Sequence, residues 1–86
     1  MEVKYPVYRK YEHNRTFFKV CSKDEFEELQ IIGHHYSIHL IKAKILPDRN
    51  FIYDLTFDFK AHWLEIEESE YNTVLSNCQK NLKRLA

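Results

Sequence analysis

Residues 51–63, FIYDLTFDFKAHW, alternate between large apolar and mostly polar side chains and carry the strongest fold signal in the chain. The odd-numbered positions are all apolar: Phe51, Tyr53, Leu55, Phe57, Phe59, Ala61 and Trp63. A period of two is typical of a β-strand that buries one of its faces. The stretch therefore predicts a strand whose apolar side forms a wall of the core and whose other side faces water or a partner.

The polar side of this predicted strand carries Asp54, Asp58 and His62, side chains that enzymes use in acid–base chemistry. On a strand, the two aspartates stand roughly 13 Å apart, given a rise of about 3.3 Å per residue. That distance is too long for two ligands of one metal ion or for the carboxylate pair of a glycosidase. We therefore interpret both as solvated carboxylates that can pair with Lys42 or Lys44 across a hairpin.

The residues before this stretch predict its hairpin partner. LPDRN (46–50) contains the residues of a turn, and YSIHLIKAKIL (36–46) is rich in isoleucine and predicts a strand. The apolar positions of this strand change parity between Leu40 and Ile41. Such a change indicates either a β-bulge or a strand that is covered on both faces.

The first part of the chain predicts another hairpin. Residues 3–11 and 16–21 are rich in valine and aromatic residues. Pro6 removes a hydrogen-bond donor, which favours an edge strand or a strand that begins near Val7. Asn14 lies in the connecting turn and can adopt a left-handed backbone conformation.

A short helix is expected to follow, over residues 22–30. Ser22 is a good N-cap, and Glu25 stands three residues later at the spacing of a capping box. Gly33, the only glycine in the chain, predicts the end of this helix or the turn into the next strand.

The C-terminal part of the chain predicts the longest helix, over residues 68–84. Its apolar residues recur at helical spacing: Tyr71, Val74, Leu75, Cys78, Leu82 and Leu85. Basic residues at its end suit the negative end of the helix dipole.

The two halves of the chain resemble each other. Residues 18–26 align without gaps with residues 63–71, each running from the end of a predicted strand into an acidic helix start. This match raises the hypothesis of a ββα duplication. The sequence thus predicts a single α+β domain over residues 1–86, with a four-stranded antiparallel sheet, two helices on one face and ββαββα order.

Composition limits the class of protein. Of the 86 residues, 44% are hydrophobic and 15% aromatic, which excludes a disordered chain, and the formal net charge is zero. Without net charge, there is no global attraction to nucleic acid or to anionic membranes. The chain has no segment of membrane-spanning length, no apolar run of signal-peptide length near Met1 and no CxxC motif, so we expect a cytoplasmic protein with reduced thiols and no membrane partner.

Histidines are the main candidates for metal ligands: His34, His35, His39 and His62. On a strand, His35 and His39 again stand roughly 13 Å apart. His39 could meet His62 or Asp58 across the predicted hairpin, which gives only a two-residue half-site. We therefore predict no cofactor and no set of metal ligands, although the sequence leaves open whether this histidine group binds a metal.

Nucleophilic catalysis has little support. Cys21 would precede the N-terminus of the predicted helix, a position that can lower a thiol pKa, but the neighbouring Asp24 and Glu25 oppose this effect. A single glycine excludes both a nucleophile elbow and a phosphate-binding loop rich in glycine. No compact catalytic constellation remains, so the sequence favours a protein without enzymatic activity.

The function expected from these features is that of a small interaction or accessory domain that self-associates through its sheet. Its partner would be a protein, either a second copy or another chain, and no small-molecule ligand is predicted. The alternative is a nucleic-acid-binding module, because basic residues alternate with aromatic residues in the first hairpin. The candidate residues for that alternative are Arg9, Lys10, Arg15 and Lys19.

Overall fold

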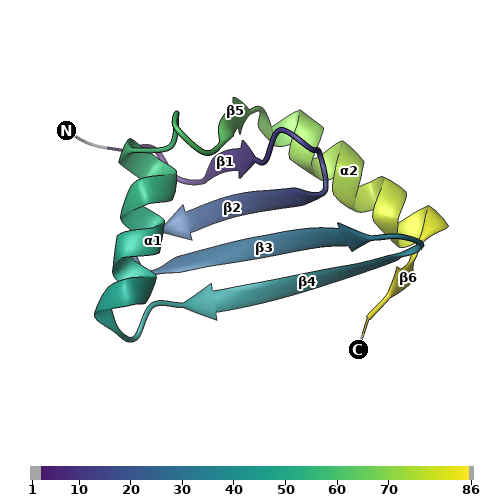
Figure 1. Cartoon of the computed structure of the whole chain (residues 1–86), viewed down its shortest axis with the longest axis horizontal. Helices are drawn as coiled ribbons and strands as arrows, with labels where there is room; N and C mark the ends of the chain where they lie inside the picture. Colours follow the sequence, from purple (N-terminus) through teal and green to yellow (C-terminus); the bar gives the residue numbers. More distant parts are fainter. Residues whose placement is uncertain (1–2, 86) are drawn as a thin grey trace.

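A mixed sheet of six strands lies at the centre of the computed structural model, which describes residues 3–85 (Figure 1). The elements are β1 (Val7–Lys10), β2 (Thr16–Ser22), β3 (Glu25–Ile32), β4 (His35–Lys42), α1 (Leu46–Phe57), β5 (Leu64–Ile66), α2 (Glu68–Asn81) and β6 (Lys83–Arg84). The strand order is β5-β1-β2-β3-β4-β6, and only β6 runs parallel to its neighbour. The protein is a small compact α+β domain, as predicted, but its sheet is larger than expected.

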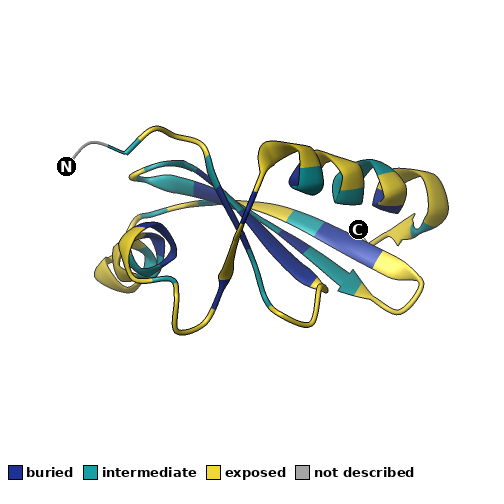
Figure 2. Ribbon diagram, turned by 90° about the horizontal axis from the view of Figure 1, so that it is seen from above, coloured by how far each residue is buried: buried dark blue, intermediate teal, exposed yellow. Residues whose placement is uncertain are grey.

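The two helices pack on opposite faces of the sheet and toward opposite ends of it (Figure 2). On β2, Phe18 packs with Leu55 of α1, whereas the neighbouring Phe17 packs with Tyr71 of α2. Successive strand residues point to opposite faces, so one strand supplies both cores. The predicted placement of both helices on one face is therefore wrong.

This diagonal arrangement explains the change of parity in β4. Tyr36 and Ile38 pack in the core under α2, whereas Ile41 and Ala43 pack in the core under α1. The strand needs apolar residues on one face near its start and on the other face near its end. Of the two alternatives drawn from the sequence, coverage of both faces is confirmed.

The stretch 51–63 is not a strand, and this prediction is wrong. Its first part belongs to α1, in which Ile52, Leu55 and Thr56 are buried at the i, i+3, i+4 spacing of a helix. Tyr53 and Phe57, predicted to face the core, are 59% and 48% exposed. The segment read as a turn before it contains Pro47, which is well tolerated in the first turn of a helix.

The end of the stretch, after α1, forms a loop that packs on the same face of the sheet as α1. Trp63 is buried there, and its ring lies 6.1 Å from that of Phe18 and 5.6 Å from that of Phe51. The predicted apolar wall is thus divided between a helix and a loop, which reach the same core in different ways.

Residues 22–30 are not a helix either, because they form the last residue of β2, the turn into β3 and most of that strand. The hydroxyl of Ser22 accepts a hydrogen bond from the N–H of Asp24 (3.1 Å), so it stabilises a turn and not a helix start. The acidic residues that resembled a helix start lie opposite basic residues, Glu27 opposite Lys19 and Glu25 opposite Lys42. Opposite charges in such cross-strand pairs stabilise a sheet.

The order of elements is consequently ββββαβαβ, and the predicted ββαββα order is wrong. The two segments aligned in the sequence differ in structure. Residues 18–26 run from β2 through a turn into β3, whereas residues 63–71 run through β5 into α2. The described residues therefore contain no pair of ββα units that could represent the proposed duplication.

Other local predictions are confirmed. Residues of the first hairpin form β1 and β2, with the first strand beginning at Val7, and Asn14 in their turn has a φ of 61°. Gly33 turns the chain from β3 into β4 with a φ of 60°, a conformation that glycine adopts without strain. The C-terminal helix is present and ends at Asn81, three residues earlier than predicted.

Candidate functional site

Arg9 joins the sheet to the end of α1. Its side chain is buried, and its guanidinium donates hydrogen bonds to the carbonyl oxygens of Leu55 (2.9 Å) and Tyr8 (2.8 Å). It also lies 3.8 Å from the centre of the Phe59 ring, a cation–π contact. Burial lowers the pKa of Arg9, but an arginine keeps its charge at neutral pH. Since the last carbonyl groups of a helix lack partners within it, Arg9 stabilises the C-terminal turn of α1.

The other basic candidates are dispersed. Lys10 forms an ion pair with Glu70 of α2 (2.7 Å). Arg15 is exposed in the turn after β1, and Lys19 is half-buried opposite Glu27. The four candidates thus do not form one basic surface, and nucleic-acid binding through them stays a prediction.

The candidate histidines lie along different parts of the surface. His34 is in the turn before β4, His35 and His39 lie on β4, and His62 is in the loop before β5 with its ring 5.5 Å from that of Trp63. All four are exposed. Among residues 3–85, no group of three or more His, Cys, Asp or Glu side chains could hold a metal ion.

Asp54 and Asp58 lie on α1 and at its end, so the predicted strand spacing between them is wrong. The N–H of Asp58 donates to the carbonyl oxygen of Asp54 (3.1 Å), which closes the last turn of the helix. The predicted ion pairs with Lys42 or Lys44 are not among the ion pairs of the described residues. Instead, the backbone N–H of Lys44 donates to the carboxylate of Asp48 (3.2 Å).

The two thiols are free and lie in different environments. Cys21 is half-buried near the end of β2, and Cys78 is buried between α2 and the sheet. Burial raises the pKa of both thiols, and Glu27 and Glu25 raise that of Cys21 further while Lys19 opposes them. Both are therefore protonated at neutral pH, which disfavours a nucleophilic role.

The outer edge of β4 is open along most of its length (Figure 1). Within residues 3–85, only β6 pairs with that edge, and it does so at His35 and Tyr36 alone. The carbonyl oxygen of Tyr36 points outward and accepts a hydrogen bond from the N–H of Leu85. The N–H of Ala43 points the other way, toward β3, and donates to the backbone carbonyl oxygen of Asp24. Because peptide groups alternate in direction along a strand, even-numbered residues present their N–H and C=O groups outward.

The groups left open at this edge are therefore those of Ile38, Leu40 and Lys42. Leu40 is 54% exposed, on the part of the sheet face that α2 does not cover. Ile45 and Leu46 follow β4 in the chain and are 60% and 68% exposed. Apolar side chains thus accompany the open backbone, a combination that favours pairing with another strand.

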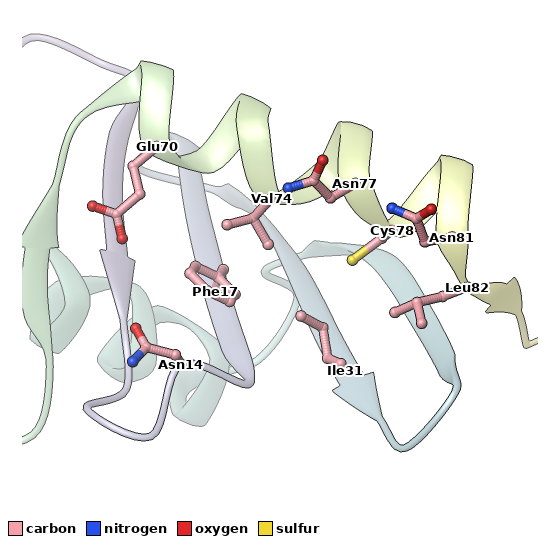
Figure 3. Close-up of a pocket in the computed structure, with 9 residues that line it drawn as sticks. All are labelled: Asn14, Phe17, Ile31, Glu70, Val74, Asn77, Cys78, Asn81 and Leu82. Atoms are coloured by element: carbon pink, nitrogen blue, oxygen red, sulfur yellow. The ribbon is translucent and has the colours of Figure 1, made fainter.

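A groove lies between α2 and the ends of β2 and β3, with a volume of about 460 Å³ (Figure 3). Its apolar lining consists of Phe17, Ile31, Val74, Cys78 and Leu82. Carboxamide side chains lie at its rim, with Asn77 and Asn81 on α2 and Asn14 on the turn after β1. An apolar cleft of this size with a few polar groups is typical of a binding site.

Comparisons with models of protein families, with curated proteins and with solved structures found no match. Neither of the helices in residues 3–85 is long and apolar enough to cross a membrane.

Sequence reasoning did not identify the β4 edge or the groove. The edge depends on the order of strands in space, for which the sequence holds no local signal. The sequence contains a partial signal for the groove. Asn77 and Asn81 are four residues apart on a helix that was correctly predicted, so they lie on one side of it.

Proposed function

We propose that this chain is a protein-interaction domain that self-associates by pairing β4 with the β4 strand of a second copy. The observation that carries this proposal is the open backbone from Ile38 to Lys42 next to the exposed Leu40. An unpaired strand edge is a template for another strand, and two identical edges can pair around a two-fold axis.

Antiparallel pairing centred on Leu40 fits the groups that the edge presents. Leu40 would lie opposite Leu40 of the second copy, and Ile38 would lie opposite Lys42, with each pair exchanging backbone hydrogen bonds. The two exposed leucines would then cover each other, and burial of apolar area contributes about 25 cal/mol per Å². The lysines would lie at opposite ends of the paired segment, so their charges would not oppose the association.

The length of the paired segment is limited on both sides. β6 occupies the edge as far as Tyr36, and β4 ends at Lys42 before α1 begins at Leu46. Because the interface is short, we expect a weak dimer whose population depends on concentration between about 10 and about 500 µM, as for transient interfaces.

Sedimentation equilibrium tests this proposal. The unchanged chain should be dimeric at the upper end of that range, and Leu40→Glu should make it monomeric because two carboxylates would face each other. Leu64→Glu is the matched control, since Leu64 is 47% exposed on β5 at the opposite edge of the sheet. Hydrogen exchange adds a local readout: the amides of Ile38, Leu40 and Lys42 should become protected as concentration rises.

A chain that is monomeric throughout this range would refute the proposal. A dimer that is unaffected by Leu40→Glu but lost with Leu64→Glu would place the interface at the other edge and refute it equally.

A further inference from the structure

We infer that the groove between α2 and the ends of β2 and β3 binds an extended, uncharged peptide segment of another protein. Figure 3 shows its two polar sides, with Asn77 and Asn81 projecting from α2 and Asn14 from the turn after β1. The inference does not rest on self-association, because no residue of β4 lines the groove.

The spacing of the two carboxamides on α2 matches the repeat of an extended chain. Asn77 and Asn81 are four residues apart on the helix, which corresponds to about 6 Å along its axis. An extended peptide repeats every two residues, or about 6.6–6.8 Å. Each carboxamide has two N–H donors and a carbonyl acceptor, so it can bind the N–H and the C=O of one peptide residue at a time.

The apolar lining follows the same repeat. Val74 and Cys78 are four residues apart on α2, and Leu82, the C-cap of the helix, follows four residues later. Cys78 and Leu82 come directly after Asn77 and Asn81 in the sequence. When the backbone of an extended peptide binds the carboxamides, every second side chain points toward the sheet. Those side chains would meet the apolar lining, to which the sheet contributes Phe17 and Ile31.

The charge of the groove indicates uncharged residues at these positions. Glu70 is the only charged residue among those that line it, and its carboxylate is held by Lys10 at 2.7 Å. The thiol of Cys78 is buried and protonated. A charged side chain entering the groove would lose hydration without gaining a partner, so apolar side chains are favoured.

NMR titration of the full chain tests the inference. The probes are three peptides with blocked ends that alternate serine with valine, with leucine or with phenylalanine over six residues. We expect at least one of them to shift the amide signals of residues around the groove, including Ile31 and Val74, and the side-chain signals of Asn77 and Asn81. The combined change Asn77→Ala and Asn81→Ala should weaken binding at least tenfold.

Two controls isolate the role of the carboxamides. Asn72→Ala changes an exposed asparagine of α2 that does not line the groove, and it should leave the affinity unchanged. A version of the bound peptide with methylated backbone nitrogens keeps the side chains but loses the N–H groups, and it should bind at least tenfold more weakly. Leu40→Glu should not alter peptide affinity, which separates this result from the test of self-association.

The inference is overturned if none of the three peptides binds at millimolar concentration. It is also overturned if a peptide binds with equal affinity to the double asparagine variant, or if backbone methylation has no effect. The last two results would mean that the groove accepts apolar side chains without recognising an extended backbone.

Discussion

The guanidinium of Arg9 donates a hydrogen bond to the carbonyl oxygen of Leu55 at 2.9 Å, across 46 positions of the sequence. This bond connects β1, a strand near the sheet edge formed by β5, to the last turn of a helix that crosses one face of the sheet. A residue proposed from the sequence as a nucleic-acid contact therefore has a structural role, in which it supplies the C-terminal carbonyl groups of α1 with a donor.

Replacing Arg9 by methionine should destabilise the domain by about 2–3 kcal/mol. Methionine keeps part of the apolar contact with Phe59 but leaves the buried carbonyls of Leu55 and Tyr8 without this donor, and charged hydrogen bonds contribute about 1.5–3 kcal/mol. Unfolding in urea, followed by far-UV circular dichroism, measures the change.

The matched control is Arg49→Met. Arg49 forms an exposed ion pair with Asp24 (2.7 Å), and such surface pairs contribute less than about 1 kcal/mol. If both substitutions destabilise the domain equally, the role assigned to Arg9 is wrong.

Tyr71 gives the domain a dependence on alkaline pH. Its hydroxyl donates to the carboxylate of Glu27 (2.7 Å), and burial together with this bond raises the pKa of Tyr71 well above its ordinary value. A raised pKa in the folded state means that folding favours the protonated form. This contribution to stability is complete below about pH 10, the ordinary tyrosine pKa, and is lost as pH rises above it.

We therefore expect Tyr71→Phe to lower the free energy of unfolding by about 1–3 kcal/mol at pH 7, because Glu27 loses its donor. Above about pH 10, the difference in free energy of unfolding between the two proteins should shrink by about 1.4 kcal/mol per pH unit. The reason is that only the unchanged chain has this hydroxyl, which ionises more easily in the unfolded state. Urea unfolding between pH 7 and pH 11 measures both effects. Tyr53→Phe, at an exposed tyrosine, controls for the loss of a phenol; an equal effect there would contradict the assignment.

Local patterns predicted the parts of the fold that depend on neighbouring residues. Asn14 and Gly33 marked their turns, and the helical spacing from Tyr71 to Cys78 located α2, because these signals are confined to a few positions. The strand prediction for residues 51–63 failed because two patterns coincide there. Ile52, Leu55 and Thr56 have helical spacing, while the apolar residues at odd positions have a period of two.

Long-range partners decided the remaining elements. In the sequence, the acidic residues of β3 resemble the start of a helix. In the sheet, Glu27 lies opposite Lys19 and Glu25 lies opposite Lys42, and the sequence does not reveal this register. The proposed site was missed for the same reason. Leu40 lies at an open edge because β3 pairs with one side of β4, and on the other side β6 pairs with β4 only as far as Tyr36. Both facts depend on the order of strands in the folded sheet.

Nucleic-acid binding by the first hairpin is a prediction that the structure restricts to few residues. Arg9 is buried and Lys10 is paired with Glu70, which leaves Arg15 and Lys19 to contact phosphates. Of the aromatic residues in this hairpin, Tyr8 and Phe17 are 7% and 2% exposed and cannot stack on a base, whereas Tyr5 is 37% exposed. Two phosphate contacts give a slope of log affinity against log salt no steeper than about −1.4 for a single strand.

We therefore expect a fluorescent single-stranded oligonucleotide to bind the chain, at most, weakly and only at low salt. The combined change Arg15→Glu and Lys19→Glu should remove that binding, whereas Lys4→Glu with Lys23→Glu reverses the same number of charges outside the candidate group and serves as the control. Fluorescence anisotropy over a series of salt concentrations measures both the affinity and the slope. A slope much steeper than about −1.4, or loss of binding only with the control pair, would show that other residues hold the nucleic acid and that this group was wrongly chosen.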